Sequence, residues 1–139
     1  MFKLSKKPLN EQMLKTNLNK SGSGASVCFE GIVRDHNEDR PVLALEYEAY
    51  EALAVLEAGL IFEEASRKFQ IRSAVCCHRV GYLRVGETAV WIGVTSAHRD
   101  TAFKACRYII DELKKRLPIW KKEHYADGNS GWINCECPH

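Results

Sequence analysis

Two lysines follow a tryptophan directly after a proline in the segment PIWKKEHYADG, residues 118–128. Because a proline ends a helix, we expect Trp120 to anchor the turn that follows in the core. A lysine held beside such an apolar anchor loses solvation, which lowers its pKa toward neutrality. Lys121 is therefore a candidate acid–base group, nucleophile or partner for an oxyanion. The competing interpretation is a solvated basic corner, which composition alone favours.

Basic residues gather on both sides of this proline, within nine positions: Lys114, Lys115, Arg116, Lys121 and Lys122. Part of this cluster is expected, because cations stabilise the C-terminal end of a helix. Lys114 follows Leu113, a residue of an apolar helix face, so Lys114 is predicted to lie beside the buried face rather than opposite it. Lys114 is the second candidate for chemistry.

The segment TSAHRD, residues 95–100, joins an apolar strand to a helix. A helix N-terminus presents unpaired N–H groups and partial positive charge, and His98 and Arg99 add side-chain donors there. The pattern predicts an anion site suited to a phosphate. The alternative is that His98 caps or packs locally and Arg99 is a surface charge. Arg34 follows the strand FEGIV, in which Gly31 indicates a bulge or a close backbone approach; alone this is a weak signal.

The six cysteines are Cys28, Cys76, Cys77, Cys106, Cys135 and Cys137. Their spacing matches neither a disulfide scaffold nor a zinc ribbon. In a strand, Cys76 and His78 would share a face, but two ligands are fewer than the three or four that zinc needs. A tail site from Cys135, Cys137 and His139 stays open as an alternative. No cysteine has a nearby activating motif, and we expect no resident metal or cofactor.

The bulk numbers restrict the class of protein. A chain of 139 residues suits a single domain, and a net charge of +2 does not indicate a general nucleic-acid binder. The motifs of P-loop nucleotide binders, dinucleotide binders, HExxH metalloproteases and GxSxG hydrolases are missing from the sequence. The lysines of the N-terminal segment precede no apolar run, so we expect no signal peptide and a reducing, cytoplasmic location. Residues 1–23, which lead into a Gly/Ser joint, are expected to form a flexible or peripheral arm before a domain over 24–139.

Alternating and helical patterns define the elements that must position these residues. Strands are expected over residues 25–33, 41–50, 71–81 and 88–96, with a short last strand over 131–137. The first two strands could pair across the polar loop between them, and residues 88–96 are apolar on both faces, as a central strand is.

Two helices complete the pattern. The helix over residues 51–69 carries an apolar face at Leu53, Leu56, Leu60 and Phe69. The second helix, within residues 98–118, is expected to begin with Asp100 as N-cap and to bury Phe103, Cys106, Ile110, Leu113 and Leu117. The order β-β-α-β-β-α-β predicts a mixed α+β fold.

Five motifs together resemble one family: FEGIVRDHN, LEYEAY, HRVGYLRVGE, VTSAHRDTAF and LKKRLPIWKKE. They are similar to the large, catalytic subunit of molybdopterin synthase, from about Gly24 to Trp132. The motifs occur in the order and at the spacing of that family. SAHR followed about twenty residues later by PIWKKE is the specific combination.

The resemblance implies a fold and an activity. The fold would be an α/β-hammerhead with an additional antiparallel β subdomain. The family inserts two sulfurs into cyclic pyranopterin monophosphate, also called precursor Z, to form the molybdopterin dithiolene. The sulfur arrives as a thiocarboxylate on the C-terminal Gly-Gly tail of a small ubiquitin-like subunit. The large subunit is a homodimer within a heterotetramer, and the tail enters a pocket that also binds the pterin.

The resemblance also assigns residues. The two functional lysines of the family match Lys121 and Lys114, and its pocket arginine matches Arg34. The anion-binding pair matches His98 and Arg99. A further position, filled in the family by Lys or Arg, matches Lys122.

Two other classes of function remain open. A phosphate- or RNA-binding module could use the same basic corner, although the basic region lacks stacked exposed aromatic residues in its sequence pattern. A zinc-binding structural protein could use the cysteines.

Overall fold

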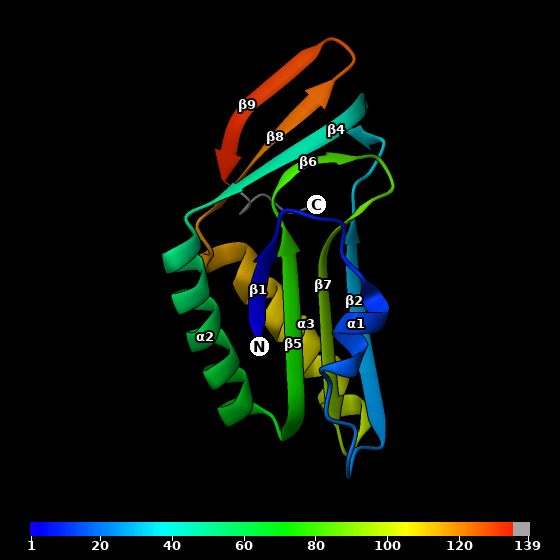
Figure 1. The fold of residues 1–139 in the computed structure, drawn as a ribbon, viewed down its shortest axis with the longest axis vertical. Coiled ribbons are helices and arrows are strands. Elements are labelled where there is room, and N and C mark those ends of the chain that lie inside the picture. The colour runs from blue at the N-terminus through cyan, green and yellow to red at the C-terminus, as the bar shows by residue number, and fades with distance from the viewer. Residues whose placement is uncertain (135–139) are drawn as a thin grey trace.

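The computed structural model describes residues 1–134, which contain three helices and nine strands (Figure 1). The strands form two sheets. The predicted α+β class is confirmed. The larger sheet has the order β1-β5-β7-β2, formed by β1 (Phe2–Ser5), β5 (Ile71–Arg79), β7 (Thr88–Ser96) and β2 (Ala25–Ile32). β7 pairs antiparallel with both β5 and β2. Its residues are buried on both faces, as the continuous apolar run predicted.

Helices cover both faces of this sheet. On one face, α2 (Glu51–Lys68) and α3 (Arg99–Arg116) bury the main core, in which Ile92 and Val94 of β7 share a cluster with Ile109 of α3. On the other face, the short helix α1 (Glu11–Thr16) covers Trp91 and Val75. Figure 1 shows α3 behind the sheet and α1 in front of it.

The N-terminal segment is part of the larger sheet, although its composition suggested a flexible or peripheral arm. β1 pairs in parallel with β5, from Phe2 opposite Cys76 to Ser5 opposite Arg79. Leu14 and Leu18 are buried in the cluster with Trp91. These contacts with residues far away in the sequence order a polar and lysine-rich segment that was expected to be flexible or peripheral.

The prediction of the buried face of α2 is wrong, because the buried positions are displaced by about one residue from the predicted ones. Ala54, Ala58, Ile61 and Ala65 form the buried side, whereas Leu53, Leu56 and Leu60 are 41%, 60% and 42% exposed. Small side chains on the buried side let α2 approach α3 and the sheet closely. The helical period was therefore read correctly, but the larger leucines were taken for the core. Phe103 of α3 is likewise exposed, whereas the rest of its predicted stripe is buried.

The second sheet stands apart from the first and is antiparallel (Figure 1). It contains β3 (His36–Asn37), β4 (Arg40–Ala49), β8 (Ile119–Tyr125) and β9 (Gly128–Asn134), and β6 (Gly81–Arg84) pairs with β4. The suggested pairing of residues 25–33 with 41–50 is wrong, because β2 belongs to the first sheet and β4 to the second. The predicted last strand is present as β9, which begins earlier than expected.

Pro118 leads directly into a strand rather than into a turn. Leu117 caps α3, and β8 begins at Ile119 and pairs antiparallel with β4 over seven residues. The proline removes one backbone donor at this junction, and its carbonyl accepts a hydrogen bond from the Tyr50 amide at 3.1 Å. The start of α2 and the end of α3 therefore meet at the entrance of the second sheet.

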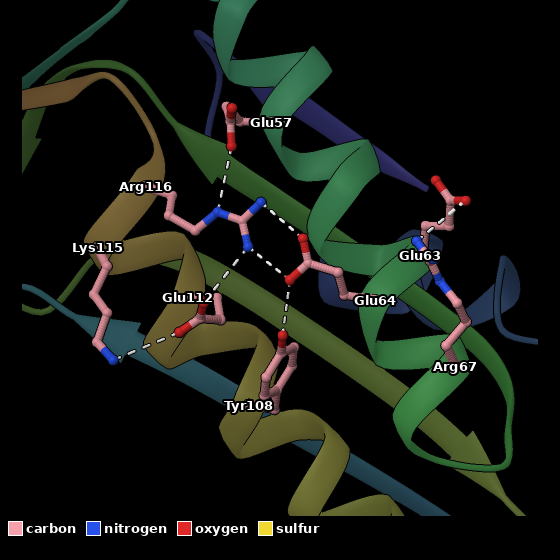
Figure 2. A network of polar contacts seen from close by, with 8 residues as sticks. All are labelled: Glu57, Glu63, Glu64, Arg67, Tyr108, Glu112, Lys115 and Arg116. Atoms are coloured by element: carbon pink, nitrogen blue, oxygen red, sulfur yellow. Dashed lines mark hydrogen bonds and ion pairs between the residues drawn. The ribbon is translucent and has the colours of Figure 1, made fainter.

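A network of charges holds α2 against α3 near this junction. Figure 2 shows Arg116 of α3 between carboxylates of both helices. Its guanidinium donates to both carboxylate oxygens of Glu64 at 2.7 and 2.9 Å and to Glu57 at 3.3 Å. The Tyr108 hydroxyl donates to Glu64 at 2.8 Å. A bidentate pair of this kind fixes geometry better than a single contact, so the last turn of α3 is held in place.

Among residues 1–134, no helix is long and apolar enough to cross a membrane.

Replacing Glu64 by glutamine should weaken the α2–α3 contact in a pH-dependent way. Hydrogen bonds from Arg116 and then Tyr108 lower the pKa of Glu64 from 4.5 to about 2. A lowered carboxyl pKa stabilises the folded chain fully above pH 4.5, and this contribution is lost as the pH falls from 4.5 toward 2. We expect Glu64→Gln to lower the free energy of unfolding at neutral pH, with a difference from wild type that shrinks over that window in urea titrations.

Glu63→Gln is the matched control on the same helix. Glu63 forms only an exposed ion pair with Arg67, at 3.3 Å, so its replacement should change stability little at any pH. Equal effects of the two substitutions, or a Glu64→Gln effect that persists undiminished at pH 2, would contradict this assignment.

Candidate active site

A cavity of about 570 Å³ lies between the end of β2, the β3–β4 hairpin and the C-terminal half of α3. Its walls combine apolar side chains with charged ones: Phe29, Glu30, Gly31, Ile32, Arg34, His36, Asn37, Val42, Leu45, Tyr47, Ala89, Val90, Arg107, Asp111, Lys114, Lys115 and Glu123. An apolar cavity with a few converging polar groups is the usual form of a small-molecule site.

Gly31 explains how the segment after β2 comes to form part of the cavity wall. A Cβ atom at this position would lie 2.7 Å from the Val90 side chain of β7, which is too close for any other residue without a shift. The pairing of β2 with β7 is also irregular between Gly31 and Ile32. The predicted bulge or close approach is therefore confirmed, and the chain leaves the sheet there so that Arg34 reaches the cavity wall.

Strand alternation places Lys121 inside the protein. Along β8, Ile119, Lys121, Glu123 and Tyr125 face inward and are buried, whereas Trp120 faces outward and is 37% exposed. The prediction that Trp120 anchors the core is wrong, because the segment after Pro118 is a strand and successive side chains point to opposite faces. Lys121 is only 1% exposed.

Glu123 compensates the charge of Lys121. The Lys121 ammonium lies 3.4 Å from Oε1 of Glu123, which is also buried. Burial alone would raise the pKa of the Glu123 carboxyl, but the hydrogen bond from Tyr125, the charge of Lys121 and the hydrogen bond from Asn37 lower it below its ordinary value. A buried ion pair is tolerated only where such further hydrogen bonds satisfy its atoms.

Lys121 lies directly behind the cavity wall. Its cross-strand neighbour on β4 is Tyr47, which lines the cavity together with Leu45 and Glu123. Because Glu123 both lines the cavity and contacts Lys121, this carboxylate connects the buried ammonium to the open space.

Lys114 and Arg34 both line this cavity, and the family resemblance had implied one pocket for them. Lys114 comes from the last turns of α3, and Arg34 comes from the segment after β2. Arg107, a third cation of the wall, is paired with Asp111 at 2.9 Å. Lys114 and Arg34 bring positive charge to the cavity from two different elements, a combination suited to an anion.

His98 and Arg99 lie at the other end of α3. Arg99 begins the helix and Lys114 follows fifteen positions later, which corresponds to about 22 Å along the helix axis. His98 and Arg99 are exposed and do not line the cavity. His98 is the N-cap residue but its side chain forms no capping hydrogen bond. The expectation that Asp100 is the N-cap is wrong, because Asp100 lies in the first turn and pairs with Lys104 at 3.0 Å.

Lys122 points away from the cavity, on the outer face of β8. Its ammonium lies 4.6 Å from the ring centroid of Trp132, which is 43% exposed. An exposed aromatic residue therefore does accompany a basic one here, contrary to the argument made from the sequence against a nucleic-acid binder.

Three residues of the site escaped prediction: Glu123, Tyr125 and Asn37. Glu123 and Tyr125 follow Lys121 at every second position. Had IWKKEHY been predicted as a strand, Lys121, Glu123 and Tyr125 would have been placed on one face. Asn37 carries no such signal, because its contacts with Glu123 and Tyr125 join positions more than 80 residues apart.

The four cysteines that the structure describes do not resemble nucleophiles. Burial raises the pKa values of Cys28, Cys76, Cys77 and Cys106, the last to about 11. Within residues 1–134, no group of three or more potential ligands could hold a metal ion. The suggested tail site of Cys135, Cys137 and His139 lies outside the described residues.

Comparisons with known proteins agree with this arrangement of elements. The family model described as MoaE protein matches residues 4–116. The chain is 42% identical to a molybdopterin synthase catalytic subunit from Thermoplasma volcanium, over 93% of this chain and 94% of that protein. The crystal structure of molybdopterin synthase from Staphylococcus aureus is similar with a TM-score of 0.85 and 35% identity, over 94% of each chain.

A complex of subunits 1 and 2 of molybdopterin-converting factor from Helicobacter pylori shares the fold, with a TM-score of 0.75 and 22% identity over 92% of this chain and 87% of that one. The family model covers most of the chain, and the Thermoplasma relative covers nearly all of it. The chain therefore belongs to the MoaE family, the family of the molybdopterin synthase catalytic subunits.

Proposed function

We propose that this chain transfers two sulfurs to cyclic pyranopterin monophosphate and so forms the molybdopterin dithiolene. The sulfur donor is the C-terminal thiocarboxylate of a small ubiquitin-like subunit. The observation that carries the proposal is the cavity lined by both Arg34 and Lys114, with Glu123 in its wall and Lys121 paired to Glu123 behind it. Membership in the MoaE family supports the same activity.

The cavity suits the two reactants. Its apolar side chains, such as Leu45, Tyr47 and Val90, can pack against a pterin ring, while Arg34 attracts the cyclic phosphate. Its volume of about 570 Å³ lies in the usual range for a small-molecule site. The complex of two subunits in the Helicobacter pylori neighbour supports a second, donor subunit for this chain.

Lys121 acts on the charge that develops during transfer. When the thiocarboxylate sulfur displaces an oxygen from a substrate carbon, the C–O bond breaks and its electron pair leaves with that oxygen. Water then attacks the acyl carbon, the acyl C–S bond breaks, and the donor tail becomes a carboxylate while the sulfur stays on the substrate as a thiolate. Negative charge therefore collects on oxygen and on the departing sulfur. A fixed ammonium stabilises this charge far better in a dry site than in water. Because Glu123 already compensates Lys121, the ammonium is held in the protein interior before the substrate arrives.

Lys114 is placed to orient the tail of the donor subunit. It comes from α3 and lines the same cavity as Arg34. A cation there can hold the carbonyl of the thiocarboxylate while the sulfur faces the substrate. The sulfur comes from the partner, so no cysteine of this chain and no resident cofactor takes part.

His98 and Arg99 can serve this substrate only from a second copy of the chain. Within one chain they lie about 22 Å along α3 from Lys114, farther than one small substrate reaches. In a two-fold dimer, the N-terminal end of α3 from one copy can approach the cavity of the other. We therefore propose a homodimer within a heterotetramer, in which these two residues complete the anion site. The position of Lys122 outside the cavity makes it a candidate for subunit contacts.

The four described cysteines are free thiols, which supports a reducing, cytoplasmic compartment for this reaction.

Removing the charge of Lys121 should abolish most turnover. We expect Lys121→Ala to lower the rate by about 100- to 1000-fold, the usual cost of losing one donor to a developing oxyanion. The assay mixes the purified chain with the thiocarboxylated small subunit and cyclic pyranopterin monophosphate and measures the dithiolene product. Lys121→Met removes the charge but keeps the length of the side chain, and it should lower the rate as much as Lys121→Ala does. This second variant separates the effect of the lost charge from the effect of a cavity left in the core.

Lys104→Ala is the control, because Lys104 is exposed and pairs only locally with Asp100. It should retain wild-type turnover. Near-normal turnover of both Lys121 variants would refute the role of this lysine. If the wild-type chain forms no product with a verified partner and substrate, the sulfur-transfer proposal fails and a phosphate- or RNA-binding module becomes the leading explanation.

A mixed dimer tests whether Arg99 acts across subunits. Lys121→Ala and Arg99→Ala chains should each be weak alone, whereas their co-expressed mixture should recover about a quarter of wild-type turnover. Half of the dimers would then be mixed, and each would have one of its two sites intact. If both residues serve the site of their own chain, mixing restores nothing, which would overturn the two-copy arrangement.

A further inference from the structure

Asn37 bridges two of the site residues that reach the cavity from different parts of the chain. Its amide oxygen accepts a hydrogen bond from Nη2 of Arg34 at 3.4 Å. Its amide nitrogen donates to Oε2 of Glu123 at 2.8 Å and lies 3.0 Å from the Tyr125 hydroxyl. The side chain itself lines the cavity.

The two oxygens of Glu123 have separate partners. Oε2 accepts from Asn37 and from the Tyr125 hydroxyl, whereas Oε1 faces the Lys121 ammonium. A carboxylate held on one oxygen cannot rotate freely, so the other oxygen stays directed at Lys121. The orientation of the buried pair therefore depends on a residue of the β3–β4 hairpin.

The turn that carries Asn37 is strained. Asn37 pairs with Arg40 across a two-residue loop, in which Glu38 and Asp39 both have positive φ, at 51° and 62°. Such a turn normally contains Asn-Gly or Asp-Gly, because other residues are unfavourable there. Backbone strain of this kind persists where the surroundings hold it, and it gathers at functional sites.

Contacts with β8 and the loop after it hold this hairpin. Besides Asn37, Arg40 pairs with Asp127 at 2.7 Å, and its guanidinium lies 3.6 Å from the ring centroid of Tyr125. The hydrogen bonds of Asn37 and the contacts of Arg40 thus both fasten the hairpin to β8, the strand that carries Lys121, and to the loop after it.

We propose that Asn37 is a positioning residue for sulfur transfer, which orients Lys121 through Glu123 and links this pair to Arg34. The inference rests on the proposed function. Asparagine suits the role because one amide supplies both an acceptor for the arginine and a donor for the carboxylate. Alanine supplies neither, and aspartate would place a second negative charge against Glu123.

Several other charges face the same cavity and bear on any titration of Glu123. Glu30 comes from β2, and Arg107, Asp111, Lys114 and Lys115 come from α3. All of them are still present when Asn37 alone is substituted, and none of them is among the hydrogen-bond partners of Asn37 described above, so a difference between variants reports on Asn37.

The first test compares the kinetics of Asn37→Ala and Asn37→Asp with wild type in the reconstituted reaction. Because the residue acts through Glu123 and Lys121, we expect kcat to fall about tenfold, the effect of one hydrogen bond to a charged group. KM for the pterin should change much less. In a Glu123→Gln background, Asn37→Ala should cause little further loss, since the partner through which it acts is already gone.

The acid limb of the pH–rate profile supplies a readout that a structural role would not move. The hydrogen bond from Asn37 lowers the pKa of Glu123, so its removal raises that pKa. Protonation of Glu123 then occurs at a higher pH, and the acid limb of Asn37→Ala should shift upward by the same amount. Asp39→Asn, an acid–amide change in the same turn without contact to Glu123, is the matched control and should keep the wild-type profile.

Carbon-13 NMR of the Glu123 carboxyl in the full chain tests the coupling without turnover. A higher pKa of Glu123 in Asn37→Ala than in wild type, together with the shifted acid limb, would support the proposal. An unchanged titration of Glu123, or a loss of rate explained by KM alone, would overturn it. If wild type is inactive, the sulfur-transfer role falls with the proposed function, and the NMR titration separately decides whether Asn37 controls Glu123.

Discussion

A charged lysine in the protein interior is the constraint on which the site depends. Lys121 is almost fully buried, and an unpaired ammonium there would cost several kcal/mol. Glu123 offsets this cost at 3.4 Å, but its own carboxylate then needs donors, which Tyr125 and Asn37 supply. The charge therefore determines the inward face of β8 and the path of the hairpin that contacts it.

The first sheet and its helices provide the frame that this arrangement needs. The bidentate contact of Arg116 with Glu64 fixes the end of α3, only a few residues before β8 begins. Lys114 and Lys121 thus lie on opposite sides of a junction that the Tyr50–Pro118 hydrogen bond ties to the start of α2. At the end of β2, Gly31 allows a close approach to Val90, and the chain that follows brings Arg34 to the same cavity.

The sequence was sufficient to predict where most helices and strands lie. It was insufficient to predict which face of a helix is buried and which strands pair. The strands β2, β4, β5 and β7 and the helices α2 and α3 lie where alternation and helical periodicity predicted them. The leucines of α2 gave a wrong prediction of its buried face. Burial depends on how closely a helix can approach its neighbours, and alanine allows a closer approach. Lys114, Arg34 and Lys121 could be selected from local sequence and resemblance. The roles of Asn37 and Glu123 could not, because they come from contacts between distant segments.

The buried pair also contributes to the register of β8, which links function to folding. A slip by one residue would turn Trp120 and Lys122 inward and would expose Lys121 and Glu123 together with the core residues Ile119 and Tyr125, so the ion pair and apolar burial favour the same register. Such a slip would separate Asn37 from Glu123 and Tyr47 from Lys121. It would also break the hydrogen bond that the Glu123 amide donates to Ser130 Oγ at 2.9 Å. Replacing an ion pair by apolar residues often stabilises a protein, so the pair is not explained by stability. The proposed function explains it, because the native register of β8 places an ammonium behind the wall of the cavity.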